Sequence, residues 1–297
     1  MKTIKMKAIN QQTLRQKLRD YRRHPFSFIL FLLVSLATVI TVGILIFLIA
    51  YILIMGIPNL SLDLFAWEYN SENVSMMPAI INTLTMTLLS LLIAVPLGIF
   101  SAIYLVEYAK RGNKLVSLVR ITAETLSGIP SIVYGLFGFL LFGMALDFGY
   151  SLLSGALTLS IMILPLIMRT TEEALKAVPD TYREGSFGLG AGRLRTVFKI
   201  VLPSAMPGIL AGIILAIGRI VGETAALIYT SGTVTGIPDS LMGSGRTLSV
   251  HMYALWNEGL NGKEAYATAV VLLILVVGIN ALSGFVAKKV GTRDANG

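Results

Sequence analysis

Two opposite charges stand inside an otherwise apolar segment in the last third of the chain. Arg219 and Glu223 are four residues apart, a spacing that places both side chains on one face of a helix. A guanidinium donates to two oxygens of an oxyanion at once and does not lose its proton. Two interpretations are open, since charge inside a membrane needs a reason. The pair either neutralises itself so that the helix inserts, or Arg219 faces an oxyanion pathway while Glu223 positions it and prevents tight trapping of the anion.

Other kinds of chemistry are poorly supported. The chain has no cysteine, so disulfides, thiolate metal sites and cysteine nucleophiles are excluded. Its two histidines, His24 and His251, lie far apart and form no H-E-x-x-H motif. There is no G-x-S-x-G motif, and the apolar segments contain no acidic dyad. We therefore expect no catalytic residue, no metal ligand and no cofactor, and the chain is predicted not to be an enzyme.

The polar segment 169–203 is long for a loop of a compact bundle, which indicates a function. Pro179 is suited to open a short helix, and a glycine-rich break follows it. A second stretch is predicted to be amphipathic, with a spacing that puts four apolar residues on one face before Pro203 ends it: Leu194, Val197, Phe198 and Val201. The pattern predicts two short helices joined by a glycine hinge, an arrangement typical of a docking device.

The glycines of this segment do not form a nucleotide site. Gly185 and Gly190 have the spacing of a phosphate-binding P-loop, but Ala191 and Gly192 occupy the positions of its lysine and hydroxyl residue. The chain is therefore not expected to bind ATP by that route.

The same segment resembles the EAA loop of ABC importer permeases, E-A-A-x₃-G-x₉-I-x-L-P. The matching residues are Glu184, Gly185, Ser186, Gly190, Ile200, Leu202 and Pro203, with Gly185 and Ser186 in place of two alanines. The resemblance implies a coupling helix that sits in a cleft of a separate ATPase subunit. Glu184 and Gly190 would shape the helix and its turn, and Phe187 would be an aromatic contact. An ordinary amphipathic connector is the alternative.

Four further blocks resemble phosphate ABC permeases, and the last of them is more similar to the PstA type than to its PstC-type partner. They are Asn82–Leu84 with Pro96–Ile99 and Ala102–Ala109, then Leu126–Gly138, then Pro165 with Arg169–Leu175, and finally Gly222–Leu227. The resemblance covers about residues 76–288. It implies a pathway lined by Arg219, Glu223 and Thr224, and the hydroxyls of Ser127 and Ser131 are further candidates, although small residues at such positions also serve helix packing.

Composition identifies an integral membrane protein. Hydrophobic residues make up 55% of the 297 residues and charged residues 13%, and the mean hydropathy is +0.77. A spanning helix needs about 20 mostly apolar residues, and six segments qualify: 26–57, 77–108, 126–146, 150–168, 204–229 and 266–286. The apolar stretch of the first is too long for a cleaved signal peptide.

The distribution of Lys and Arg predicts the orientation. Most of the 24 basic residues fall in the N-terminal arm, in two loops and in the tail, on one side of the six segments. Because such loops face the cytoplasm, both termini are predicted to be cytoplasmic in a multi-pass inner-membrane protein. The predicted organisation is a basic arm at 1–25, a first helix at 26–57, a core at 76–288 with the coupling loop 169–203, and a tail at 289–297. The arm lacks interleaved aromatic residues, so no nucleic-acid partner is expected.

The predicted fold is therefore all-α, with six transmembrane helices: an ABC type-1 permease core of five and one added N-terminal helix. The implied function is half of the translocation pathway of an ATP-driven phosphate importer. The implied partners are a homologous PstC-type permease, two ATPase subunits, an extracytoplasmic phosphate-binding protein and membrane lipid. A permease for sulfate, molybdate or another small solute is the near alternative. A secondary transporter is a more distant one, because we find no repeated halves.

Overall fold

The computed structural model describes residues 25–110, 112–259 and 261–293. Every regular element in these three ranges is helical, which confirms the predicted all-α class. The chain separates into two compact units, residues 1–54 and 55–297, which are described separately.

The first unit consists, where described, of residues 25–54 of helix α2 (Pro25–Gly56), a helix that agrees with the predicted segment 26–57. Its side chains are almost all apolar and exposed. The hydroxyls of Thr38 and Thr41 donate to the carbonyls of Val34 and Ala37, 2.8 Å and 2.9 Å away. These bonds satisfy the polar groups within the helix, as a lipid environment requires. The predicted basic arm lies almost wholly outside the described residues.

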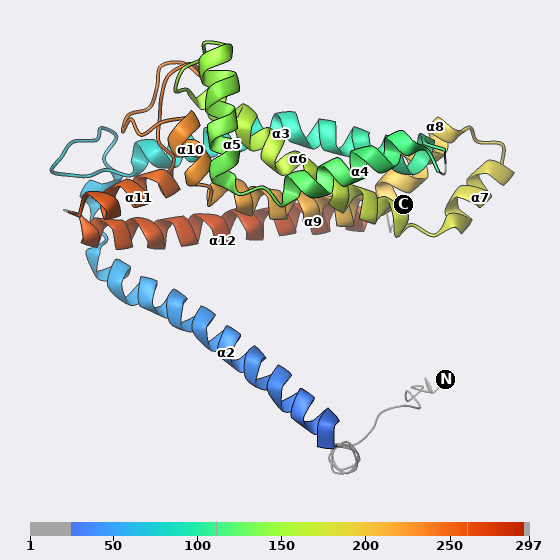
Figure 1. The fold of residues 1–297 in the computed structure, drawn as a ribbon, viewed down its shortest axis with the longest axis horizontal. Helices are drawn as coiled ribbons and strands as arrows, with labels where there is room; N and C mark the ends of the chain where they lie inside the picture. Colours follow the sequence, from blue (N-terminus) through green and yellow to red (C-terminus); the bar gives the residue numbers. More distant parts are fainter. Residues whose placement is uncertain (1–24, 111, 260, 294–297) are drawn as a thin grey trace. The chain divides into compact units, whose positions relative to one another are not determined.

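The second unit is a bundle of helices (Figure 1). Two short 3₁₀ turns, Ile57–Asn59 and Leu62–Phe65, precede it. Its elements are α3 (Met77–Ile103) with the π-helical turn η3 (Tyr104–Tyr108), α4 (Lys114–Ser127), α5 (Ser131–Gly138) with the π-helical η4 (Phe139–Ala145), α6 (Leu152–Lys176), α7 (Asp180–Gly188), α8 (Arg193–Thr196) with the π-helical η5 (Val197–Val201), α9 (Leu202–Val221), α10 (Ala225–Thr230), α11 (Leu248–Glu258) and α12 (Gly262–Arg293).

Helix α6 forms the centre of this bundle and packs against α3 and α9. Small residues permit the close approach. A Cβ on Gly98 of α3 would lie 2.7 Å from Ile167 of α6, and one on Gly212 of α9 would lie 2.1 Å from Thr170. Larger side chains would push these helices apart, because interiors are close-packed.

The third predicted span is not one straight helix. Helices α4 and α5 are bent by 104° at the break before Ser131. Pro130 explains the break, since proline has no N–H to donate and disfavours helical backbone in the residue before it. The sequence indicated this proline, but the prediction of a single helix over 126–146 was wrong, and α4 had been assigned mostly to a loop.

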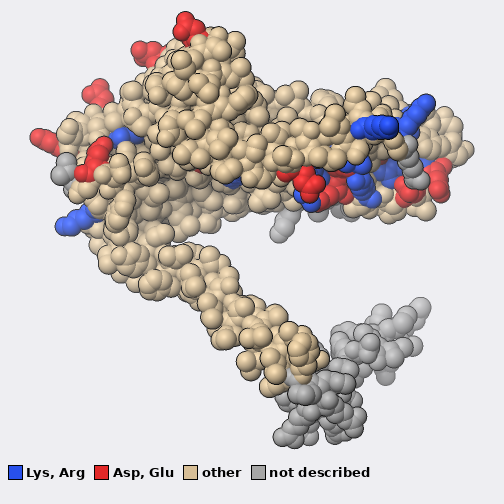
Figure 2. All heavy atoms as spheres, viewed as in Figure 1, with Lys and Arg blue, Asp and Glu red and all other residues tan. Residues whose placement is uncertain are grey.

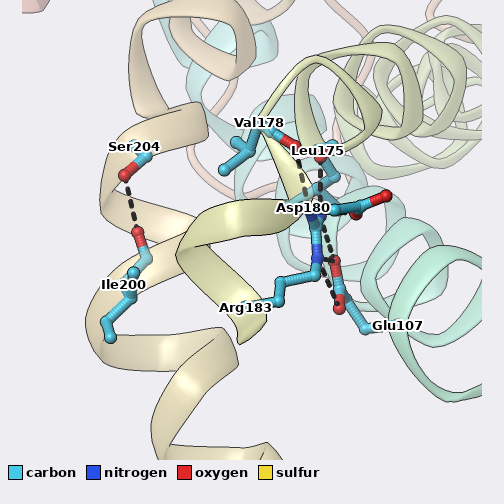
Figure 3. Close-up of polar contacts among 7 residues, drawn as sticks. All are labelled: Glu107, Leu175, Val178, Asp180, Arg183, Ile200 and Ser204. Atoms are coloured by element: carbon cyan, nitrogen blue, oxygen red, sulfur yellow. Dashed lines mark hydrogen bonds and ion pairs between the residues drawn. The ribbon is translucent and has the colours of Figure 1, made fainter. Parts of the chain in front are cut away.

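The fifth predicted span is also interrupted. Helix α9 ends at Val221, residues 222–224 are not helical, and α10 follows. The prediction that Pro203 ends the preceding stretch was wrong as well, because the helical backbone runs from η5 into α9 and Pro203 lies in the first turn of α9. Proline is tolerated at that position, and the Ser204 hydroxyl donates to the Ile200 carbonyl there, 2.7 Å away (Figure 3).

The described residues contain five helices long and apolar enough to cross a membrane, and six spans if the bent α4–α5 pair counts as one. This agrees with the predicted number. In the second unit, Lys and Arg gather mainly at the end with α7 and α8, whereas acidic side chains predominate at the end with α11 (Figure 2). Helix α12 continues past residue 288 to Arg293, so the predicted tail at 289–297 begins inside a helix.

Candidate functional site

The interruption between α9 and α10 separates the two charges that the sequence placed on one helix face. Arg219 lies half-buried in the last turn of α9, and Glu223 lies buried beyond its end. One Glu223 carboxylate oxygen accepts from the Ala226 backbone N–H, 3.1 Å away, and its carbonyl accepts from the Ser249 hydroxyl, 2.5 Å away. No ion pair within the described ranges includes Arg219. The predicted Arg219–Glu223 ion pair is therefore not formed, because the helix ends too early.

The α4–α5 bend lies next to this interruption. Helix α5 packs tightly on α10, since a Cβ on Gly135 would be 2.8 Å from the Cα of Ala226. The Tyr134 hydroxyl donates to the Leu126 carbonyl across the bend, 2.8 Å away, and Tyr134 interacts electrostatically with Arg219. A bent segment and an interrupted one thus meet near Arg219, which forms no ion pair with the residues that the structure describes.

The smaller predicted pathway residues flank these two breaks. Ser127 is exposed at the end of α4 and donates to the Glu124 carbonyl, 2.7 Å away, and Ser131 is the first residue of α5. Thr224 is half-buried at the start of α10. Their contact with a transported ion stays a prediction. The packing role that small residues can have here is seen at Gly138, where a Cβ would lie 2.1 Å from Thr158.

At the opposite end of α6, the segment 169–203 forms the predicted pair of short helices. Pro179 precedes α7, and the hinge contains Gly190 with φ +81°. Only glycine adopts that backbone without strain. The Ser186 hydroxyl is buried against that of Thr196, 2.8 Å away, and joins α7 to α8. The resemblance therefore matches a helix, a turn and a second helix at the expected places.

The predicted apolar face of the second helix is only half right. Val197 and Val201 are buried, but Leu194 and Phe198 are exposed. The reason is the π-helical turn η5, whose wider winding changes the spacing of a regular helix. The exposed side chains of this end include Tyr182, Phe187 and Leu194, and Leu189 is 91% exposed.

The other predicted coupling residues are distributed along the same segment. Glu184 and Gly185 are exposed on α7, whereas Ile200, Leu202 and Pro203 are half-buried where η5 passes into α9. Of the eight residues, Ser186 is the buried one, so most of the set remains accessible.

An ion pair that the sequence analysis missed fixes α7 to the bundle (Figure 3). Arg183 of α7 donates through Nη2 to Glu107 of η3, 2.7 Å away, and through Nε to the same carboxylate, 3.2 Å away. Its Nη1 and Nη2 also donate to the carbonyls of Val178 and Leu175, at 2.8 Å and 2.9 Å. The hydrogen bond to Glu107 raises the pKa of the Arg183 guanidinium above its ordinary value, against the effect of burial.

Three further contacts lie at the same end. Arg193 of α8 lies over the ring of Tyr108, 5.5 Å from its centre. Arg120 of α4 and Lys176 both reach Glu172 of α6, each at 2.6 Å. Charged contacts thus join α7 and α8 to η3 and α7 to the end of α6, and a further one joins α4 to α6.

At the end with α11, residues of the motif Asn82–Leu84 form hydrogen bonds that fix the neighbouring segments. The Asn82 side chain donates to the carbonyls of Gly236 and Arg246, and Thr83 accepts from the Leu248 backbone N–H, 2.8 Å away. The two ends of the Gly-, Ser- and Thr-rich segment 231–249 are buried and hydrogen-bonded, for instance between the Ser231 hydroxyl and the Gly245 carbonyl, 2.6 Å apart.

The structure is a bundle of membrane-length helices with one bent span, an interruption between α9 and α10 and a pair of short helices at one end. The chain belongs to the family described as "Binding-protein-dependent transport system inner membrane component", whose model matches residues 94–293. Together with the family match, this gives the class: a permease subunit of a binding-protein-dependent importer.

Similar proteins narrow this further. The chain is 34% identical over 267 residues to the probable ABC transporter permease protein YqgI of Bacillus subtilis, which covers 83% of this chain and 90% of that one. It is 38% identical over 218 residues to the phosphate transport system permease protein PstA 1 of Mycobacterium tuberculosis, covering 72% and 70%. A bacterial alginate ABC transporter has the same fold, with a TM-score of 0.67 at 15% identity over 91% of this chain and 98% of that chain.

The chain is thus a multi-pass permease subunit of an ABC importer, with the predicted type-1 fold. Such a subunit is a transport component and not an enzyme, and its family works with an ATPase and an extracytoplasmic binding protein.

Proposed function

We propose that this chain is the PstA-type permease of a phosphate importer and forms half of the pathway together with a PstC-type permease. The observation that carries the proposal is Arg219, a half-buried arginine without an ion-pair partner in the described part of the chain, where two interrupted spans meet. Similarity to PstA proteins supports phosphate as the anion. Guanidinium donors match its oxygens, and discontinuous helices recur at transport sites.

The proposed role of Arg219 is transient binding. A site that conducts must hold its ion weakly enough to release it. Glu223 lies buried nearby in sequence and caps α10, so its charge limits the local positive field while it fixes the interruption. Thr224, Ser127 and Ser131 would supply hydroxyls to the same path.

Helix α7 is the proposed coupling helix for one of two ATPase subunits. Its exposed Tyr182 and Phe187, with Leu189 at the hinge, provide an apolar docking surface. Closure of the ATPases would press on α7, and the Arg183–Glu107 pair would pass the displacement to α3. In this arrangement the end with α7 and α8 is cytoplasmic, as are both termini, and the end with α11 receives the phosphate-binding protein.

Uptake of labelled phosphate at low micromolar concentration tests the substrate. Strains with the intact gene, with the gene deleted and with Arg219→Ala are compared at equal membrane levels, with sulfate and molybdate as competitors. We expect deletion and Arg219→Ala each to abolish uptake, and sulfate to compete poorly.

A matched control uses Arg195→Ala, an exposed arginine of α8, which should keep uptake. In a strain without another phosphate system, unchanged uptake after deletion would refute the phosphate assignment. Full uptake with Arg219→Ala would refute the role of that arginine.

A further inference from the structure

A pocket lies at the α11 end of the bundle, and Arg219 is not among the residues that line it. It has a volume of about 300 Å³ and is formed by α11, by the segment before it and by the stretch that precedes α3. Polar side chains dominate its lining: Tyr69, Thr233, Thr235, Arg246, Tyr253 and Asn257.

Arg246 is the unusual member of this lining. The residue is 3% exposed, and its backbone is fixed at both polar atoms. Its N–H donates to the Val234 carbonyl, 2.9 Å away, and its carbonyl accepts from Asn82, 3.2 Å away. Its guanidinium lies over the ring of Tyr69, 4.9 Å from the centre. The backbone hydrogen bonds and the contact with Tyr69 therefore hold the Arg246 side chain in a defined position.

Two of the three guanidinium nitrogens nevertheless lack a hydrogen-bond partner among the described residues, while Tyr69 acts as a side-chain hydrogen-bond partner of the group. Its Nε and Nη2 atoms are buried without a hydrogen-bond partner, and none of the ion pairs within the described ranges includes it. Burial lowers the pKa of Arg246, with Tyr69 and Glu258 acting in the opposite direction. Arginine still keeps its proton in proteins. A buried, charged donor pair without acceptors is rare in native structures, because buried donors are normally satisfied by the protein, by water or by a bound ion.

The two unpartnered nitrogens indicate the kind of ligand. Nε–H and Nη2–H point along the same edge of the guanidinium plane, which is the edge that grips two oxygens of a phosphate or carboxylate. Hydroxyls of Thr233, Thr235 and Tyr253 line the same pocket and are additional donors. We propose that this pocket binds free inorganic phosphate before it reaches the pathway at Arg219. The identity of the anion rests on the proposed function, whereas the site itself rests on Arg246.

Glu258 adds a basis for selection. It lines the pocket and acts electrostatically on Arg246. A carboxylate only accepts hydrogen bonds, so it repels a fully deprotonated anion and accepts from a protonated one. Hydrogen phosphate carries a proton near neutral pH and sulfate does not, so the pocket favours phosphate over sulfate.

The test measures equilibrium binding of labelled inorganic phosphate to the purified importer in nanodiscs, without its extracytoplasmic binding protein and without nucleotide. An Arg219→Ala background removes the proposed pathway site. Adding Arg246→Met should weaken the remaining binding by at least about tenfold, the worth of one lost charge-assisted hydrogen bond.

A second variant guards against misfolding. Thr235→Glu places a negative charge in the pocket without altering the buried arginine, and should weaken binding similarly. Ser240→Glu adds the same charge to the same segment at an exposed position outside the lining, and should leave binding unchanged.

Phosphate binding that survives both Arg246→Met and Thr235→Glu would overturn the site. So would dependence on Arg246 only when the extracytoplasmic binding protein is present, because the pocket would then take a carboxylate of that protein. Arg246-dependent binding of sulfate but not phosphate would keep the anion site and refute the proposed substrate. Glu258→Gln should reduce the preference for phosphate over sulfate.

Discussion

Arg183 and Arg246 lie at opposite ends of the same bundle, and their guanidinium groups differ in how many hydrogen-bond partners the chain provides. Arg183 at the α7 end donates to a buried carboxylate and to two carbonyls (Figure 3). Arg246 at the α11 end is more deeply buried, yet two of its nitrogens have no acceptor. The comparison separates two uses of charge. Donors saturated by the chain hold structure together, and donors left open are available to a ligand.

The largest expected effect is at the saturated end. Arg183→Gln leaves Glu107 buried without its partner, which should lower the free energy of unfolding by roughly 2–4 kcal/mol. Thermal denaturation of the purified chain in detergent measures this decrease in stability. Arg195→Gln removes an exposed arginine from neighbouring α8 and should have little effect. The double variant Glu107→Gln, Arg183→Gln should recover part of the loss, and a purely additive loss would contradict a coupled pair.

A second effect concerns pH at the α11 end. Burial and the nearby charge of Arg246 lower the pKa of His251 from 6.5 to about 3. The unfolded chain therefore binds a proton below pH 6.5 that the folded chain refuses until about pH 3, so stability falls as the pH falls through this window. The loss should reach roughly 2 kcal/mol at pH 5. His251→Leu should flatten the acid side of the stability profile, and an unchanged slope in that variant would show that other groups cause it.

Arg246→Met should behave unlike Arg183→Gln. Burying a charge costs desolvation free energy that no ion pair of Arg246 within the described residues offsets, so we expect less than about 1 kcal/mol of loss in phosphate-free buffer. Phosphate should raise the melting temperature of the intact chain more than that of the variant. A large loss without phosphate would mean that Arg246 is structural, like Arg183.

The smallest effect is expected at Lys176. Its side chain is half exposed, and Glu172 also pairs with Arg120, so Lys176→Ala should cost less than about 0.5 kcal/mol. Glu172→Gln removes both pairs and should cost more. Equal losses in the two variants would contradict a shared carboxylate.

Much of the fold was accessible from the sequence. Apolar length alone located α2, α3, α6 and α12, because a bilayer imposes that length on a helix. The hinge at Gly190 was also predictable, because glycine readily adopts a positive φ and because the motif spacing places a glycine there. The proline at position 130 indicated the break, but the prediction of one helix followed the hydropathy of the segment instead.

The site was less accessible. The interruption after Val221 has no proline, and without it Arg219 and Glu223 look like an ordinary helical pair. Glu107 and Arg183 are 76 positions apart and meet only through the packing of α7 beside η3. Arg246 appeared as one more basic residue in a loop, because its burial and its missing partners exist only in the folded chain.

The most direct test of the account measures phosphate transported and ATP hydrolysed by the reconstituted importer in proteoliposomes, for the intact chain, Arg183→Gln and Arg219→Gln. If Arg183 transmits motion and Arg219 handles the anion, Arg183→Gln should lower both quantities together. Arg219→Gln should abolish transport while hydrolysis stimulated by the binding protein persists. The account would be contradicted if Arg219→Gln transported phosphate as fast as the intact chain. It would also be contradicted if that variant lost ATP hydrolysis while phosphate transport persisted.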